Sequence, residues 1–505
     1  MPKRSPWFTF FFMICLAICL VGMSFIFPSG KLELPFGLTL RYPSIDLILG
    51  NDRPKYQDIS ETVVIADSIQ DALALDSGFS LFRADSLDSL EWVSRFRRIN
   101  IDSLRAAEKY VQPLEFKDGN SDVLLKFFQA LNKAALHGHK THVFHYGDSQ
   151  IEGDRMTSYI RDRLQKRIGG FGIGMVSASN KDVMPALIQV NSESWNRYPL
   201  FAPKGDSAFS DNYGAMCSYS SYTPFPTDSV LHDSAKTIAS VRFNTSKTIY
   251  NSSKKFSQVR LFYGPVFDPV KLTFPINDTV FTDYLKGTKK LNSVLLEFND
   301  PLDEIELRFE SELSPQIYGV SLEGAGGVQV NNIAMRGSSG TIFHKMDRTL
   351  FTEMHTELNT SLILMQFGGN VMPYMKDEQQ AIDYGRYFYN QLRIVQAACP
   401  NASIIVIGPA DMSLKAEAYY ESYPLIPKVR DALKEAAFKA GAAYWDMYEA
   451  MGGENSMPSW VEADPALAGT DYTHFTPRGA RIISEFFYKA LIIEYESYNQ
   501  KRANE

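Results

Sequence analysis

The hydrophobic pattern of this chain changes its period twice, and this change constrains the fold more than any other feature. In residues 121–184 and 325–505, short apolar runs alternate with amphipathic stretches. Short apolar runs predict buried strands, and apolar residues at the helical period predict helices. The expected strands are 141–146, 328–335, 361–367, 403–407 and 442–445, and the expected helices are 122–136, 155–167, 378–398, 428–440 and 477–495. Such alternation predicts an α/β fold, with a parallel sheet covered by helices on both faces.

Residues 185–324, between these two regions, lose the helical period and alternate apolar with polar residues over short segments. Gly, Pro, Asn and Asp separate the segments, as expected of turns. The expected strands include 239–243, 259–263, 270–274, 294–298, 304–309 and 317–322. This region is therefore predicted to be an all-β sandwich or jelly-roll domain inserted into the α/β domain.

The N-terminal segment predicts export. Residues 7–27 carry no charge and are long enough to cross a bilayer as a helix, and Lys3 and Arg4 precede them. The end of the run, at 24–28, makes a poor signal-peptidase site. We therefore expect residues 1–28 to be a retained inner-membrane anchor with the catalytic body in the periplasm or extracytoplasmic space. A cleaved signal peptide with secretion to the periplasm is the alternative.

Residues 29–120 are expected to form a stalk or linker with short helices. The scattered acids and serines between 56 and 104 suit either small helices packed on the main domain or a spacer above the membrane. The sequence leaves both open.

Composition excludes several classes of protein. Hydrophobic residues make up 45 % and charged residues 22 %, which excludes a largely disordered or multi-pass membrane protein. The net charge is -7 without a basic block, so no nucleic-acid partner is expected. Cys217 and Cys399 are the cysteines outside the apolar N-terminal run, and they lack CxxC spacing. One disulfide between them remains possible, but the sequence supports neither a zinc site nor a disulfide framework.

No metal and no cofactor is expected. Four of the eight histidines cluster at His137, His139, His142 and His145. No acidic or cysteine ligand lies among them, so structural roles are expected for all four.

Ser149 is the first candidate for chemistry. It follows the expected strand 141–146 and precedes a helix, within Gly147-Asp148-Ser149-Gln150. Open α/β folds hold their active sites at this carboxyl edge of the sheet. The serine hydroxyl becomes a useful nucleophile once a base removes its proton. The alternative role for this segment is a helix N-cap in a turn.

Asp471 and His474 are the candidates for the base and its support. They precede the last helix, and Asp-x-x-His spacing lets the carboxylate hold the imidazole from within one loop. That contact fixes the tautomer and stabilises the imidazolium as it forms. The alternative is a solvated loop that caps the helix starting at Pro477.

Two glycine-rich loops offer donors for an oxyanion. One is 336–340, with Gly337, and the other is 367–370, with Asn370. Acyl transfer needs preorganised N–H groups aimed at the developing negative charge. Taken singly, either loop is more typical of a tight turn than of an oxyanion site.

Together these blocks resemble the SGNH (GDSL-type) hydrolase superfamily, over roughly residues 140–180 and 328–495. The resemblance implies a flavodoxin-like three-layer sandwich. It also implies that Ser149 is the nucleophile, His474 the base and acid, and Asp471 its orienting partner. The oxyanion hole would consist of the backbone N–H groups of Ser149 and Gly337 and the amide of Asn370.

The chain departs from the usual family pattern in three places. Gln150 replaces a leucine, Val371 replaces a frequent aspartate, and Gly337 lies far beyond Ser149. The β insertion accounts for the last departure. An exported domain of this type with a β-sandwich between its first two blocks resembles bacterial envelope peptidoglycan and polysaccharide O-acetylesterases. It also resembles the exported partners of membrane-bound O-acyltransferases.

The sequence therefore predicts an exported serine esterase that removes O-acetyl groups from cell-envelope or other polysaccharide, with O-acetylated polysaccharide or peptidoglycan as substrate. Two alternatives remain: a polysaccharide O-acetyltransferase working with a membrane O-acyltransferase, and a non-catalytic carbohydrate-binding protein. A long-chain lipase is disfavoured because no segment after Phe27 is apolar enough for a lid. In the inserted region, aromatic residues are candidates to stack on sugars or to fill the core: Tyr219, Tyr222, Phe225, Tyr263 and Phe267.

Overall fold

A computed structural model describes most of the chain. The described residues are 6–27, 31–35, 38–44, 54–64, 112–179, 184–201, 211–224, 235–246, 250–277, 279–416 and 418–504. Much of the expected stalk therefore lies outside the described residues. Of the part that is described, residues 56 and 57 contact the α/β body, because the Tyr56 hydroxyl donates to the Tyr420 carbonyl and the Gln57 amide donates to the Glu454 carbonyl.

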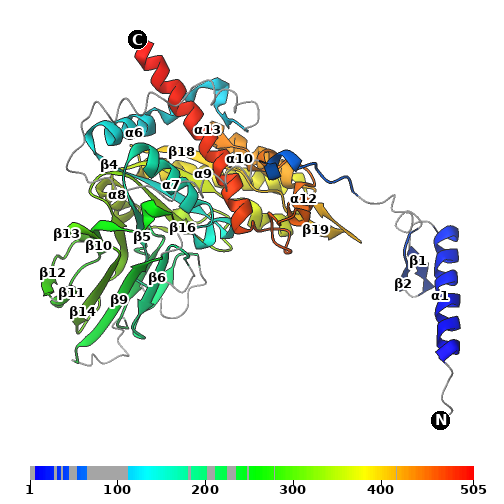
Figure 1. Cartoon of the computed structure of the whole chain (residues 1–505), viewed down its shortest axis with the longest axis horizontal. Helices are drawn as coiled ribbons and strands as arrows, with labels where there is room; N and C mark the ends of the chain where they lie inside the picture. Colours follow the sequence, from blue (N-terminus) through cyan, green and yellow to red (C-terminus); the bar gives the residue numbers. More distant parts are fainter. Residues whose placement is uncertain are drawn as a thin grey trace.

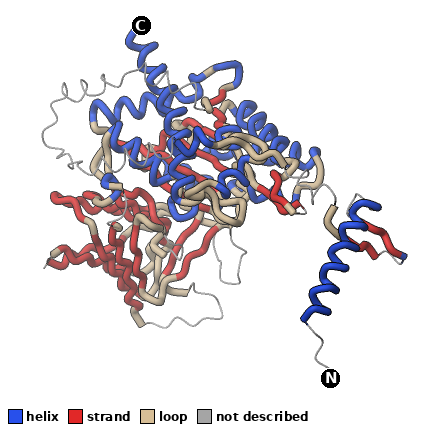
Figure 2. Tube along the Cα trace, turned by 45° about the vertical axis from the view of Figure 1, so that its right-hand side comes forward, coloured by secondary structure: helices blue, strands red, loops and turns tan. Residues whose placement is uncertain are grey.

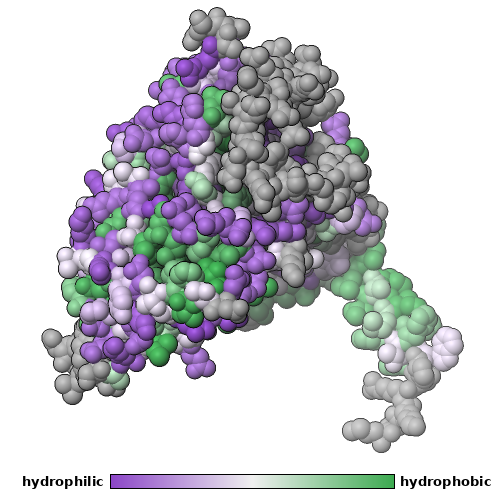
Figure 3. All heavy atoms as spheres, turned by 60° about the vertical axis from the view of Figure 1, so that its left-hand side comes forward, coloured by the Kyte–Doolittle hydropathy of each residue, from purple (hydrophilic) through white to green (hydrophobic). Residues whose placement is uncertain are grey.

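The N-terminal helix α1 (Pro6–Ile26) is the one helix in the described part of the chain that is long and apolar enough to span a membrane. Its side chains form a continuous hydrophobic surface that is almost wholly exposed (Figure 3). A short hairpin of β1 (Lys31–Leu34) and β2 (Leu38–Arg41) follows it. Such a helix fits either a membrane anchor or a signal sequence.

A six-stranded, mainly parallel sheet forms the centre of the body (Figure 1). Its strand order is β16 (Gly327–Ala334), β4 (Lys140–Gly147), β17 (Thr360–Gln366), β18 (Ser403–Ile407), β21 (Ala443–Trp445) and β3 (Leu114–Glu115). The first five strands are parallel, and β3 adds an antiparallel edge from within the range expected for the stalk. Gly147 pairs with both Ala334 and Gln366, so neighbouring strands end at the same edge.

Helices cover both faces of this sheet, as the tube of Figure 2 shows. One face carries α6 (Leu125–His137), α7 (Thr157–Ile168), α12 (Ser456–Glu462) and α13 (Pro477–Asn504), and the other carries α8 (Arg348–Glu357), α9 (Glu378–Ala398) and α10 (Ile426–Ala440). Alternate strand residues enter separate cores: Phe144 and Tyr146 pack on the second face, and Val143 packs on the first. The result is three layers built on buried apolar strands, as the sequence predicted.

Two antiparallel sheets enclose a third core. One has the order β13 (Asn292–Leu302), β10 (Phe256–Tyr263), β15 (Ile317–Glu323), β8 (Ser218–Ser221) and β7 (Asn196–Pro199), with β5 (Gly172–Val176) also paired to β15. The other has the order β12 (Thr279–Leu285), β11 (Val270–Ile276), β14 (Glu304–Ser311), β9 (Thr237–Thr245) and β6 (Leu187–Asn191). The predicted fold class, α/β with additional antiparallel sheets and an apolar N-terminal helix, is confirmed.

The antiparallel strands begin earlier in the chain than the pattern predicted. β5 lies before residue 185, yet it pairs with β15 rather than with the parallel sheet. Its glycines explain why the pattern missed it: a Cβ at Gly172 would lie 2.5 Å from the Leu322 carbonyl oxygen. The close approach of two backbones therefore defines this strand, and it leaves no alternation of side chains to detect.

Candidate active site

The turn after β4 presents Ser149. β4 ends at Gly147, and Ser149 is the first residue of the short helix η5 (Ser149–Asp154). Asp148 caps η5, its Oδ1 accepting a hydrogen bond of 3.0 Å from the Gln150 backbone N–H. A Cβ at Gly147 would lie 2.9 Å from the Ile151 side chain and 3.1 Å from the Gln366 carbonyl oxygen, so a larger residue would crowd this end of the strand. Ser149 consequently lies at the carboxyl edge of the parallel sheet.

The loop before α13 brings His474 to this serine. His474 Nε2 lies 2.8 Å from Ser149 Oγ, and His474 Nδ1 lies 2.7 Å from Asp471 Oδ2. Because Nδ1–H donates to the carboxylate, Nε2 is the acceptor for the serine hydroxyl. The backbone N–H groups of Thr473 and His474 also donate to Asp471 Oδ1. The three predicted residues therefore form one continuous chain of hydrogen bonds.

Asp471 remains a charged partner for this imidazole. Partial burial alone would raise its pKa, but the hydrogen bonds from the His474 ring and from the two backbone N–H groups lower the pKa of Asp471 below its ordinary value. Both groups are open to solvent, with side-chain exposures of 54 % for Asp471 and 30 % for His474. Water therefore has access to this side of the site.

Asn370 lies beside Ser149 through Asp148. It stands in the short helix η8 (Gly369–Tyr374), which directly follows β17. Its Nδ2 donates to Asp148 Oδ2 and to the Ser338 carbonyl oxygen, each at 3.1 Å. These bonds join both glycine-rich loops to the serine turn. An acyl oxygen would therefore have to share or displace one of the two amide hydrogen bonds.

Gly337 occupies the loop after β16, next to Ser338. Its φ of +79° is in the left-handed region, and a Cβ there would meet nothing within 4 Å. The loop is thus open on the solvent side, while the Ser338 carbonyl behind it holds the Asn370 amide. The predicted oxyanion residues Ser149, Gly337 and Asn370 all follow strands that end at the same edge of the sheet.

The sequence analysis did not identify two neighbours of Ser149, Asp148 and Gln150, as functional residues. The sequence analysis assigned Asp148 no role beyond a helix N-cap, yet its buried carboxylate also accepts a hydrogen bond from Asn370. Burial raises the pKa of Asp148 from 3.8 to about 6. Gln150 was noted as a departure from the family pattern, and its Nε2 donates over 2.6 Å to the Thr473 carbonyl. It therefore ties the serine turn to the histidine loop. The presence of a polar residue, Gln150, where the family usually has leucine was the sequence signal that could have identified this contact.

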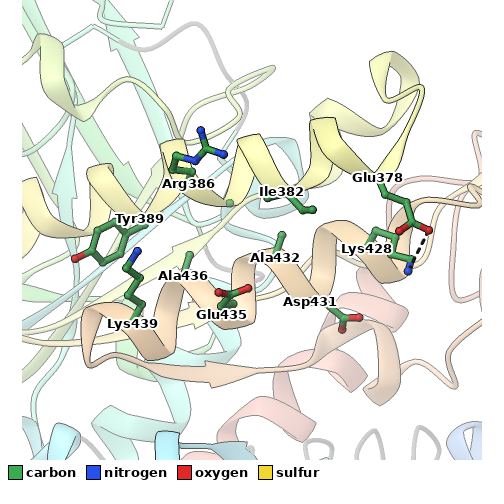
Figure 4. A pocket seen from close by; sticks show the side chains of 11 residues that line it. Glu378, Ile382, Arg386, Tyr389, Lys428, Asp431, Ala432, Glu435, Ala436 and Lys439 are labelled. Carbon is green, nitrogen blue, oxygen red and sulfur yellow. Dashed lines mark ion pairs between the residues drawn. The ribbon is translucent and has the colours of Figure 1, made fainter.

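Two hollows lie beside these residues. A small one of about 30 Å³ is lined by Ser149, Asn370, Phe367, Pro409 and Met412. A larger one of about 440 Å³ lies between η5 and β16 on one side and the antiparallel sheets on the other. A third hollow, a groove between α9 and α10, lies apart from the site (Figure 4). Its walls carry exposed charges such as the pair of Lys428 and Glu378, and none of the site residues lines it.

The remaining candidates lie elsewhere. Tyr219, Tyr222 and Tyr263 are buried in the cores, so they do not face a sugar; Phe267 is 81 % exposed, and Phe225 lies outside the described residues. The buried His142 and His145 contact Glu323 and Gln366, respectively, whereas His137 and His139 are exposed.

Cys217 and Cys399 are both buried free thiols, which answers the open question of a disulfide between them. Within the described ranges, no three His, Cys, Asp or Glu side chains are grouped so as to hold a metal ion.

Comparison with known proteins finds no matching family model and no matching curated protein. Among solved structures, a peptidoglycan O-acetylesterase aligns over 75 % of this chain and 97 % of its own, with a TM-score of 0.57 and 20 % identity. A GDSL-like lipase from Parabacteroides merdae aligns over 33 % of this chain and 74 % of its own, with 12 % identity and a TM-score of 0.26. A family two carbohydrate esterase from Clostridium thermocellum aligns over 50 % of this chain and 90 % of its own, with 10 % identity and a TM-score of 0.23. Neither alignment is close enough to support an argument. The chain therefore shares the fold of this solved peptidoglycan O-acetylesterase, and its four sequence blocks resemble those of the SGNH hydrolases.

Proposed function

We propose that this protein is a serine esterase of the SGNH type that removes O-acetyl groups from a polysaccharide. The observation that carries the proposal is the chain of hydrogen bonds from Ser149 Oγ through the His474 ring to Asp471. A non-catalytic carbohydrate-binding protein would have no chemical need for this arrangement at the carboxyl edge of the sheet.

In the proposed mechanism Ser149 Oγ attacks the ester carbonyl while its proton passes to His474 Nε2. Asp471 holds the other ring nitrogen and stabilises the imidazolium. The backbone N–H groups of Ser149 and Gly337 and the amide of Asn370 stabilise the oxyanion. His474 then gives the proton to the departing sugar oxygen, which leaves the acyl group on Ser149. Water, activated by His474, releases the acid and restores the serine.

The small hollow beside Ser149 supports a short acyl group. Phe367, Pro409 and Met412 line it, and its volume of about 30 Å³ suits a short acyl group and not a long chain. The exposure of His474 and Asp471 supports water as the second acceptor, and hydrolysis is therefore favoured over transfer to a second sugar. The solved peptidoglycan O-acetylesterase supports an O-acetylated envelope glycan as the substrate class.

We further propose the roles of the chain segments. Residues 1–28 anchor the protein in the inner membrane and residues 29–120 link it to the body, which acts outside the cytoplasm. Residues 121–184 and 325–505 form the hydrolase domain, and 185–324 form the inserted β domain. The exposed, apolar α1 supports the anchor.

The test is acetate release by the full chain in detergent from O-acetylated peptidoglycan and from O-acetylated xylan. Wild type is expected to release acetate from at least one polymer, and Ser149→Ala is expected to lose at least about a thousand-fold in kcat because the nucleophile is gone. An unchanged melting temperature in Ser149→Ala shows that the fold is intact. Release that persists in Ser149→Ala contradicts the proposal.

A further inference from the structure

Ser149 stands between two hollows of different size and character. The smaller hollow lies at the ends of β17 and β18, and Ser149 itself lines it. The larger hollow lies on the opposite side, towards β16 at the edge of the sheet. Its near wall is η5, the helix that begins with Ser149, because Glu152 and Asp154 of this helix line it. Three residues of chain span at most about 10 Å, so the larger hollow opens close to the serine.

The ester substrate has an acyl side and an alcohol side, and the attacked carbon lies between them. The two sides must therefore lie in different directions from Ser149. The hollow of about 30 Å³, whose walls are largely apolar, suits a short acyl group. The hollow of about 440 Å³ is lined by the polar residues Glu152, Gln189 and Asn332 beside the apolar Ile188, which suits a sugar chain with hydroxyl groups and apolar ring faces.

We propose that the larger hollow, between η5 and β16 on one side and β5 and β6 on the other, binds the glycan chain that carries the acyl ester. This proposal rests on the proposed esterase function. It assigns to the antiparallel part of the chain one wall of the substrate site, through β6 and its neighbours (Figure 1).

Hydrogen bonds fix the wall nearest to the reaction. Asn332 at the end of β16 donates to the Ile151 carbonyl over 2.8 Å and to Asp154 Oδ1 over 3.3 Å. Asp154 in turn is held by the fully buried Arg161, with 2.7 Å between Asp154 Oδ2 and Arg161 Nη1. This wall is therefore rigid before a ligand arrives, which lowers the entropic cost of binding.

An ion pair joins this hollow to the oxyanion loop. Glu152 lies 3.6 Å from Arg336, whose side chain is 77 % exposed and whose neighbour in the sequence is Gly337. A sugar that contacts Glu152 or Arg336 from the hollow would thus lie next to the loop that receives the carbonyl oxygen. The ion pair therefore connects Glu152 on the wall of the hollow to the loop that carries Gly337.

The far wall offers a matched pair of variants for a test. Ile188 and Val190 lie on the edge strand β6, point to the same face, and are 59 % and 58 % exposed. Ile188 lines the hollow and Val190 does not. A tryptophan at either exposed strand position is compatible with the fold. Ile188→Trp therefore adds bulk on the far wall of the hollow, whereas Val190→Trp adds the same bulk outside it.

The experiment compares the full-length wild type, Ile188→Trp and Val190→Trp on 4-nitrophenyl acetate and on O-acetylated peptidoglycan and xylan. Ile188→Trp is expected to lower kcat/KM on the polymer at least ten-fold and to change the aryl ester less than two-fold. Val190→Trp is expected to match wild type on both. Equal behaviour of the two variants on the polymer overturns the proposal, and so does an equal loss on both substrates.

A binding measurement separates this proposal from the proposed function. Co-sedimentation with insoluble O-acetylated peptidoglycan is carried out with each tryptophan variant in the Ser149→Ala background, where no turnover occurs. Weaker retention of the Ile188→Trp protein alone supports a glycan site in the hollow even if wild type proves to hydrolyse nothing. If the Ile188→Trp protein is retained as well as its Val190→Trp counterpart, and aryl esterase activity depends on Ser149, the esterase function is supported and the glycan site in the hollow is rejected.

Discussion

At the scale of single residues, Asp148 and Asn370 connect the catalytic blocks. The buried Asp148 carboxylate accepts hydrogen bonds from Gln150 N and Asn370 Nδ2, and the Asn370 amide also holds the Ser338 carbonyl. One amide thus fixes the spacing of the serine turn and both glycine-rich loops. If the amide also stabilises an oxyanion, its contribution belongs to the transition state and not to substrate binding.

Asn370→Ala is expected to lower kcat by about 10²- to 10³-fold with little change in KM, because one preorganised donor to the oxyanion is lost. Steady-state kinetics on 4-nitrophenyl acetate measure both constants. Asn370→Asp, which keeps the size and removes the donor, is the control and is expected to be as slow. A change confined to KM would show that Asn370 only binds substrate.

Asp148→Asn tests the burial of a carboxylate in this site. Burial raises the pKa of Asp148 to about 6, from 3.8. The folded protein therefore binds the proton more tightly than the unfolded chain, and this contribution to stability is full below pH 3.8 and lost as the pH rises to about 6. The stability of Asp148→Asn relative to wild type is expected to rise across this window, by roughly 2 to 3 kcal/mol at most.

Urea unfolding of both proteins at a series of pH values from 4 to 8 measures this difference. Activity is expected to fall in Asp148→Asn at every pH, because the new amide opposes the Asn370 amide with a donor instead of an acceptor. A stability difference that stays constant with pH would contradict a raised pKa for Asp148.

At the scale of elements, a small hairpin supports the histidine loop. The hairpin consists of β19 (Ser413–Ala416) and β20 (Tyr419–Ser422), and the Ser413 N–H donates to the Tyr472 carbonyl. Tyr420 stacks on Tyr472 with 3.5 Å between the ring centroids and 5° between the planes. Tyr472 has a φ of +54° and lies between Asp471 and Thr473. The stacked pair therefore holds a strained residue in the middle of the catalytic loop.

Tyr420→Ala is expected to lower kcat several-fold, because the loop that aims His474 at Ser149 loses its support. Tyr420→Phe keeps the stacked ring and is expected to restore the wild-type rate, since the hydroxyl takes no part in the stacking. The measurement is kcat and KM on the aryl ester. Equal losses in both variants would assign the effect to the hydroxyl and contradict the positioning role.

The sequence predicts some elements better than others, and the reason is physical. β18 and α9 have the expected limits, because a run of buried apolar residues and an amphipathic period are local signals. Ser149, Asp471 and His474 were predicted because each follows or precedes such an element. The contact of Asp148 with Asn370 joins residues 222 positions apart, and β5 depends on a partner strand distant in sequence. A local sequence pattern cannot predict contacts between residues so far apart in the chain.

At the scale of the whole molecule, a buried ionic cluster joins the parallel sheet to the antiparallel part. Glu323 on β15 is fully buried, with Lys140 Nζ at 2.7 Å and His142 Nε2 at 3.3 Å on β4. Burial alone would raise its pKa, but the hydrogen bonds and charges of His142 and Lys140 hold the pKa of Glu323 well below its ordinary range. This cluster is one contact that fixes the wall of the larger hollow relative to the parallel sheet.

Glu323→Gln is expected to lower the free energy of unfolding by about 3 kcal/mol at pH 7, because the largely buried ammonium group of Lys140 loses its carboxylate partner. Gln258 accepts a hydrogen bond from Lys140 and donates one to the exposed Glu297. Glu297→Gln is therefore the control, with an expected change under about 1 kcal/mol. Urea unfolding of the full chain in detergent gives both values. Similar values for the two variants would show that the cluster does not hold the two parts together.

The central claim, that Ser149 carries the acyl group during turnover, is tested most directly by locating that group. Wild type, His474→Ala and Ser149→Ala are mixed with 4-nitrophenyl acetate, quenched in acid within the first turnovers, digested, and examined by peptide mass spectrometry. The account predicts an acetyl group on the peptide containing Ser149 in wild type and none on that peptide in Ser149→Ala. His474→Ala is expected to acquire it far more slowly. Acetate release by wild type with the acetyl group on another residue, or undiminished release by Ser149→Ala, would contradict the account.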